Sequence, residues 1–198
     1  MTVLHRLLLT VFCLIAVSPV FAAGPSEHVR AIVSGIVTYT RWPSLTGAPK
    51  LCIFASSRFT HSLAHALGGV FRVPHGRANA LLMAHVVAWN ADYHGQCDTL
   101  AARKYARLAH LLDLPASTPR EGVTSLLVAI QTLKDEMNMP RGINDTGVNA
   151  ADFDQRLAEM VAQALRDSCT PTNPREPDAR ALTELYRQAW SGNIAQCH

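Results

Sequence analysis

Three histidines close together in the sequence have the side-chain chemistry and the spacing of a metal site. His61 and His65 are four residues apart in an apolar stretch, so in a helix both imidazoles leave the same face about one turn apart. His75 follows shortly afterwards, on an expected turn that folds back towards that face. Neutral imidazoles bind borderline divalent metals such as iron and zinc. Spacing alone leaves the alternative open that these are ordinary surface or packed histidines.

Two helices joined by a short connection are needed to position these histidines. The apolar run around His61 and His65 predicts a helix that Gly68 and Gly69 end, and residues 77–89 predict a second helix. From Thr60 onwards the chain is expected to be all-α, and we predict a mainly α helical bundle. Four further helices are expected, at 99–112, 118–138, 149–168 and 178–190. The second should begin at a capping box at 118–121 and the third at a cap at 149–152, and in the first we expect Leu100 to face inward.

The string HSLAHALGGVFRVPHGRANA closely resembles the iron-dependent (group III) alcohol dehydrogenases, especially the alcohol dehydrogenase half of the bifunctional aldehyde-alcohol dehydrogenases. The resemblance continues to about residue 190 through AWNAD, KYARLA, LKDEMNMPRGIND and DSCTPTNPR. It implies that residues 60–198 are the family's C-terminal helical domain, which closes one side of the active-site cleft. It also implies that His61 and His75 bind Fe²⁺ or Zn²⁺, and that His65 is a catalytic residue beside the substrate and the nicotinamide.

Other parts of the family's active site are missing from the sequence. It contains no GGGS loop for the phosphates of NAD, no strand-helix alternation typical of a dinucleotide domain, and no D-A-x-x-H helix for the other two metal ligands. Asp92, His94 and Asp98 have the wrong spacing to replace those ligands. We therefore expect a weakly held metal and an inactive fragment or gene fusion. NAD as cofactor and a small alcohol or aldehyde as substrate are implied by the resemblance only.

Residues 1–22 have the features of a secretory signal peptide. A charged start with His5 and Arg6 precedes the apolar run LLLTVFCLIAV, which is short for a bilayer span, and the small-residue exit V-F-A follows. We expect a periplasmic product that begins near Ala23; an uncleaved anchor is the alternative, and the protein stays cytoplasmic if the leader is not used. Outside the leader the chain has four cysteines, Cys52, Cys97, Cys169 and Cys197. Four cysteines can pair as disulfides in three ways, and the sequence does not choose between them.

Residues 26–40 predict an amphipathic helix, and residues 51–55 predict a short strand. The stretches VSGIVTYTRWP and KLCIFASSRF resemble the YfiR family of periplasmic proteins, which repress a membrane-bound diguanylate cyclase. The resemblance covers residues 1–59, so we expect a YfiR-like helix-strand segment at 23–59 and a junction near positions 59 and 60. A YfiR-like regulator of a membrane diguanylate cyclase is therefore the alternative function.

The composition fits one globular domain and gives no support to nucleic-acid binding. The chain has 198 residues, of which 48% are hydrophobic and 17% are charged, which is enough for an ordinary core. The net charge of +3 is mild, and Lys and Arg are scattered along the sequence. No basic stripe with interleaved aromatic residues is present, so we expect no nucleic-acid partner.

Overall fold

The structure is a computed structural model that describes residues 53–194, with side chains from Arg58 onwards. All regular secondary structure in this range is helical, which confirms the predicted mainly α fold class. No helix in the range has the length and apolarity needed to cross a membrane. The helices are α3 (Ile53–Phe71), α4 (His75–Asn90), α5 (Leu100–Leu111), α6 (Pro119–Glu136), α7 (Ala150–Arg166) and α8 (Ala179–Ser191), with short 3-10 helices η1 (Ile143–Thr146) and η2 (Thr170–Thr172).

Four helices begin with a capping residue, three of them at the cap or start that the sequence predicts and α5 at Thr99, the first residue of the helix expected at 99–112. In each case a side-chain oxygen accepts a hydrogen bond from a backbone N–H in the first turn, which would otherwise lack a partner. The caps and the residues whose N–H they accept are Thr99 with Ala102, Thr118 with Glu121, Asn149 with Ala151 and Asp152, and Asp178 with Ala181. These helix starts are therefore encoded locally.

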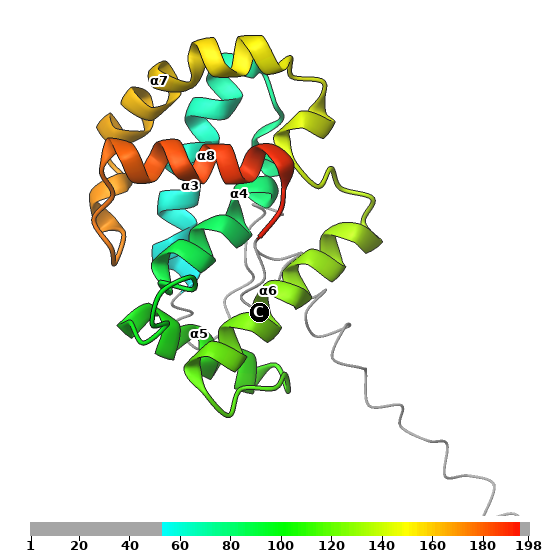
Figure 1. Ribbon diagram of the computed structural model, residues 1–198, viewed down its shortest axis with the longest axis vertical. Helices are drawn as coiled ribbons and strands as arrows, with labels where there is room; N and C mark the ends of the chain where they lie inside the picture. Colours follow the sequence, from blue (N-terminus) through cyan, green and yellow to red (C-terminus); the bar gives the residue numbers. More distant parts are fainter. Residues whose placement is uncertain (1–52, 195–198) are drawn as a thin grey trace, which may run out of the picture.

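Helix α4 lies in the middle of the molecule, with α7 and α8 on one side and the α5–α6 pair at the opposite end (Figure 1). Its two faces contribute to two apolar clusters. The first cluster joins α3, α4, α7 and α8, and its largest members include Phe59, Leu63, Leu67, Leu82, Met160 and Tyr186. The second joins the C-terminal half of α4 to α5 and α6, and includes Val87, Tyr93, Tyr105, Val123, Leu127 and Ile130.

The predicted strand at 51–55 is wrong for the part that the structure describes. Ile53–Phe71 is one continuous helix, so its first three residues are helical. A short apolar run has no periodicity that separates a buried strand from a buried helix segment, and here the helical residues that follow decide the outcome. Positions 51 and 52, the predicted helix at 26–40 and the proposed leader lie outside the described residues.

Two further predictions about helices also need correction. Gly68 and Gly69 do not end the first helix, which continues to Phe71. Glycine in a helix interior costs about 1 kcal/mol, but a Cβ on Gly68 would lie 3.1 Å from the Val73 carbonyl oxygen, so the returning chain favours a small residue there. Leu100 does not face inward: it is 63% exposed at the first position of α5, on the same helix face as the exposed Arg103 and Lys104.

Candidate metal centre

A tight reversal between α3 and α4 positions the candidate metal-binding residues. Arg72 has a left-handed backbone with φ of 58°, and its N–H donates to the Gly68 carbonyl at 2.9 Å. Pro74 then precedes α4 with φ of −53°, a value that its ring fixes in advance. His75 is therefore the first residue of α4, one position beyond the turn on which the sequence placed it.

The reversal brings His61, His65 and His75 together. The distance between His61 Nδ1 and His75 Nε2 is 2.9 Å. The ring centroid of His65 lies 4.0 Å from that of His61 and 5.2 Å from that of His75. One nitrogen from each ring lies within 4.8 Å of the other two, and no second set of His, Cys, Asp or Glu in residues 53–194 is gathered in this way. His61 is partly exposed and the other two are exposed, so small molecules in solution can reach the cluster.

The donor set and its spacing suit a borderline divalent metal. Two imidazole nitrogens bound to zinc at about 2.0–2.1 Å in a tetrahedron are about 3.3 Å apart. The His61 and His75 nitrogens, at 2.9 Å, are held by a hydrogen bond and need to separate only slightly. Metal binding replaces the proton between them, since both nitrogens must offer lone pairs. The residues present therefore fit iron or zinc.

The surroundings of these two rings favour the neutral imidazole, which is the form that binds metals. Burial lowers the pKa of His61, and the neighbouring His65 and His75 lower it further, although Asp167 opposes the change. Burial and the nearby His65 likewise lower the pKa of His75. At neutral pH a metal thus competes with few protons for the nitrogen lone pairs.

Two polar residues contact the cluster that sequence reasoning did not single out. The Asn79 Nδ2 amide donates to His75 Nε2 at 2.9 Å and to the His75 carbonyl at 3.0 Å. Asp167 Oδ2 lies 2.9 Å from His65 Nδ1. The spacing of Asn79, one helical turn after His75, was a usable signal. Asp167 gave no local signal, because it follows His65 by 102 residues.

Asp167 remains a carboxylate in this environment. Burial by itself would raise its pKa, but hydrogen bonds from His65, the Cys169 backbone and the Ser62 side chain lower the pKa overall. The Cys169 N–H donates to Asp167 Oδ1 at 2.8 Å, so each carboxylate oxygen has its own donor. Asp167 itself is the residue that ends α7.

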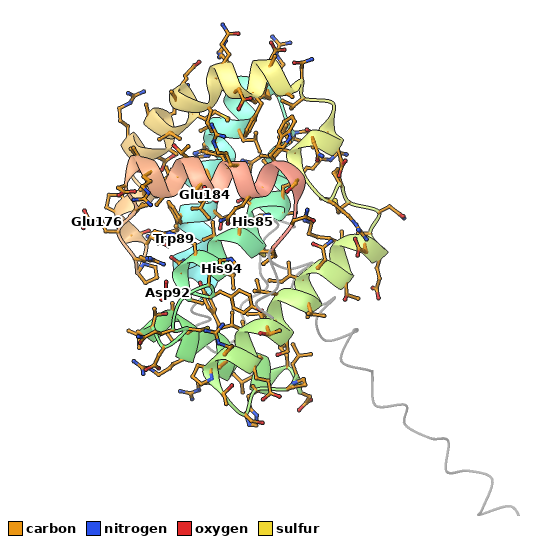
Figure 2. All side chains as sticks on the ribbon, in the orientation of Figure 1. His85, Trp89, Asp92, His94, Glu176 and Glu184 are labelled. Carbon is orange, nitrogen blue, oxygen red and sulfur yellow. The ribbon has the colours of Figure 1, made fainter. Side chains whose placement is uncertain are left out.

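Asp92, His94 and Asp98 do not belong to the histidine cluster, which is the group of possible metal ligands found among the described residues. Asp92 and Trp89 lie at the C-terminal end of α4 (Figure 2). The loop that carries Glu176 lies on the same side of the molecule. Its carboxylate pairs with Arg175 at 3.4 Å, and the Asp98 carboxylate pairs with Arg103 at 2.7 Å. The carboxylates of these two residues therefore pair with arginines, away from the three histidines.

The architecture and the histidine cluster define the class: an all-helical domain with a candidate metal centre between its first two described helices. The comparison with known families gives the particular assignment. Residues 54–190 match the sequence model of the Fe-containing alcohol dehydrogenase family, C-terminal part. The chain therefore belongs to the Fe-containing alcohol dehydrogenases.

Relatives of known function agree with this assignment over the same region. The bifunctional aldehyde-alcohol dehydrogenase AdhE of Escherichia coli (strain K12) is 36% identical over 142 residues, which cover 67% of this chain and 16% of that protein. The 1-propanol dehydrogenase PduQ of Citrobacter freundii is 37% identical over 130 residues, which cover 65% of this chain and 34% of that protein. The match therefore spans about a third or less of either relative's length.

A solved structure shows the same fold. The crystal structure of a 1,3-propanediol oxidoreductase superposes with a TM-score of 0.57 at 28% sequence identity, and the match covers 67% of this chain and 32% of that one. The described helices therefore correspond to one helical part of a larger enzyme of this family.

Proposed function

We propose that this chain is the metal-binding helical part of an iron-dependent, NAD-linked alcohol dehydrogenase site. The observation that carries the proposal is the 2.9 Å approach of His61 Nδ1 and His75 Nε2 from two successive helices. The lowered pKa of both rings supports it, because neutral imidazoles bind Fe²⁺ or Zn²⁺. With two ligands from this chain, we expect the metal to be held weakly, since a catalytic site normally uses three protein ligands.

The residues of the cluster have different proposed roles. His61 and His75 hold the metal, and the Asn79 amide, which donates to His75 Nε2 in the metal-free protein, must release that nitrogen when the metal binds. When bound, the metal polarises the oxygen of an alcohol or an aldehyde. His65, whose side chain is 51% exposed, contacts the substrate as the catalytic histidine and does not bind the metal. The relatives named for aldehydes, alcohols and 1-propanol support a small alcohol as substrate.

We do not expect this chain to turn over alcohols by itself, so the proposal describes an inactive fragment or gene fusion. Residues 53–194 contain no strand-helix alternation that could hold NAD. Correct orientation of two reactants is worth about 7–11 kcal/mol of the barrier, and the described helices offer no nucleotide-binding loop to provide it. A further segment or a second chain is required to complete the site.

Metal binding by the full chain tests the first part of the proposal. We expect Zn²⁺ to bind in a calorimetric titration and to be lost on dialysis against a chelator. Replacement of one ligand, in His61→Ala or His75→Ala, should weaken binding at least about tenfold. The control is His110→Ala, an exposed histidine in the last turn of α5, which should bind as the wild type does. Equal binding by all variants would contradict the assignment, and metal that resists the chelator would contradict weak binding.

An assay of NAD reduction tests the second part. Ethanol, 1-propanol and propanediol are supplied with NAD and Fe²⁺ under reducing conditions, and the absorbance of reduced nicotinamide is followed. We expect no turnover above the protein-free rate. Turnover that disappears in His75→Ala would overturn the fragment proposal, because the chain would then hold the cofactor by itself.

We further propose, from the sequence alone, that the product is periplasmic and that the segment after the leader, expected at 23–59, derives from a YfiR-like regulator as far as its junction with the helical domain. Helix α3 is continuous across positions 59 and 60, Phe59 is fully buried, and the family match begins at residue 54. These observations favour a junction before residue 54 over one at 59–60. N-terminal sequencing of the protein from a periplasmic extract tests the export proposal: we expect a start near Ala23, and an intact Met1 on cytoplasmic protein would contradict it.

A further inference from the structure

We propose that Asp167 is a positioning residue that fixes which nitrogen of His65 carries the proton. His65 projects from α3 towards the end of α7, where Asp167 Oδ2 lies 2.9 Å from His65 Nδ1. A carboxylate can only accept hydrogen bonds, so the proton of this bond must belong to Nδ1. The neutral ring then carries its lone pair on Nε2. In this way Asp167 keeps Nε2 of His65 as a hydrogen-bond acceptor for a substrate.

The carboxylate is itself held in place, which is what a positioning role requires. Its other oxygen, Oδ1, accepts the Cys169 N–H at 2.8 Å, so rotation of the carboxylate would break two hydrogen bonds at once. The Asp167 side chain is 18% exposed, whereas His65 is 51% exposed. The partly buried, fixed partner therefore determines the state of the more accessible ring. Hydrogen bonds that orient a functional imidazole through its second nitrogen are a common feature of metal sites.

Asn79 does not do the same for His65, because its amide donates to His75, on Nε2 and on the backbone carbonyl. Within the described part of the chain, Asp167 is the group that bonds to Nδ1 of His65. The role of Nε2 as a substrate contact rests on the proposed function. The position of the proton on His65 does not, since it follows from the bond to Asp167 in the metal-free protein.

Replacement of Asp167 by asparagine gives a sharp test. The asparagine oxygen can keep the bond from the Cys169 N–H, and its NH₂ group then faces His65 Nδ1. A donor at that position requires an acceptor, so the proton of the neutral ring should move to Nε2. A charge-assisted hydrogen bond is strong enough that its loss should change the ratio of the two tautomers at least about tenfold.

Nitrogen NMR of the full chain, uniformly labelled with ¹⁵N and free of metal, measures this ratio. Long-range ¹H–¹⁵N spectra at about pH 8.5, where an ordinary imidazole is neutral, distinguish a protonated ring nitrogen from one with a lone pair. The signals of His65 are identified by their loss in His65→Gln. We expect the Nδ1–H tautomer in the wild type and mainly the Nε2–H tautomer in Asp167→Asn.

The matched control is Glu159→Gln, which removes a carboxylate from the same helix α7, where Glu159 pairs with Arg156. It should leave the His65 signals unchanged. An Nε2–H tautomer in the wild type would overturn the proposal even if Asp167→Asn did not fold. Unchanged tautomers in a folded Asp167→Asn protein would also overturn it and leave Asp167 as a structural tether of η2. Failure to bind Zn²⁺ would refute the proposed function and leave the tautomer result intact.

Discussion

The two apolar clusters that meet at α4 differ in the sequence separation of their polar contacts and in the exposure of their large hydrophobic side chains. The cluster of α3, α4, α7 and α8 is tied by polar contacts between distant parts of the chain, such as Tyr186 with the Leu63 carbonyl and His65 with Asp167. The cluster of α5 and α6 is closed by nearer contacts, such as Ser125 with the Pro115 carbonyl. The large hydrophobic side chains that the described structure leaves exposed all lie in or beside this second pair: Leu100, Leu111, Val128 and Met137.

The candidate metal centre lies in the first of these two regions. The histidine cluster lies at the edge of the first region, where polar side chains from α3, α4 and the end of α7 meet. The second region forms an apolar groove beside α6, lined in part by Leu114, Pro115, Val128 and Leu133. The candidate metal-binding residues thus lie in the region that is tied by polar contacts distant in sequence.

The largest expected effect comes from core truncation in either region. Leu67 is 0% exposed in the first cluster and Leu127 is 5% exposed in the second. Leu67→Ala and Leu127→Ala should each lower the free energy of unfolding by about 2–5 kcal/mol, because each removes buried methyl groups and leaves a cavity. Chemical denaturation followed by circular dichroism measures this. We expect one transition in each case, since α4 contributes to both clusters; two separate transitions would show that the regions are independent.

Acidification should lower the free energy of unfolding by about 3 kcal/mol through one residue, His85, which lies on the helix where the two regions meet. His85 lies on α4 (Figure 2), is 2% exposed, and has a Nδ1 atom without a hydrogen-bond partner. Burial, together with the nearby Lys134 ammonium, lowers its pKa from 6.5 to about 4. The folded protein therefore binds fewer protons than the unfolded chain between these values, so stability falls as the pH drops from about 6.5 to 4.

Replacing this histidine should flatten the pH profile. His85→Leu removes the titrating group, so its stability should depend less steeply on pH, by up to about 1.4 kcal/mol per pH unit across that interval. Denaturation curves at a series of pH values compare the variant with the wild type. Above pH 7 the two profiles should run parallel, since neutral His85 no longer titrates there. Identical slopes below pH 6 would contradict the buried, neutral state of His85.

A smaller effect is expected for the bond that links α8 to α3. The Tyr186 hydroxyl donates to the Leu63 carbonyl at 2.9 Å, and the tyrosine is fully buried. Tyr186→Phe keeps the ring and removes this bond, so the unfolding free energy should fall by about 0.5–1.5 kcal/mol. The matched change in the second region is Tyr93→Phe, whose hydroxyl lies 3.1 Å from Thr124 Oγ1. A larger loss for Tyr93→Phe would reverse the proposed dependence of the first region on long-range polar contacts.

The smallest effect is expected on the exposed apolar face of α6. Val128 is 54% exposed, so Val128→Lys should change the unfolding free energy by less than about 0.5 kcal/mol. Leu127→Ala serves as the contrasting variant one position earlier on the same helix. Thermal denaturation at low protein concentration measures the change. A large loss of stability would mean that this face is covered in solution.

Local signals account for what the sequence predicted well. The capping residues at Thr118, Asn149 and Asp178 define helix starts by themselves, and the structure confirms them. The proximity of His61 and His75 was also predictable, because only a short connection separates their helices. The Asp167 contact was not, since neither position carries any trace of a partner 102 residues away. Gly68 and Gly69 misled for a related reason: at Gly68 the returning chain at Val73 favours a small residue, a packing constraint that the local sequence does not show.

Two hydrogen bonds of the histidine cluster, between His61 and His75 and between His65 and Asp167, differ in the length of chain that they close. His61 and His75 are 14 residues apart, whereas His65 and Asp167 are 102 residues apart. The entropy cost of closing a loop grows with its length, and contacts between distant residues form later in folding. The pair that resembles metal ligands belongs to a helical hairpin that can form early. The proton on His65, in contrast, reports whether α7 has docked, so its NMR signal would distinguish the complete fold from a hairpin that already brings His61 to His75.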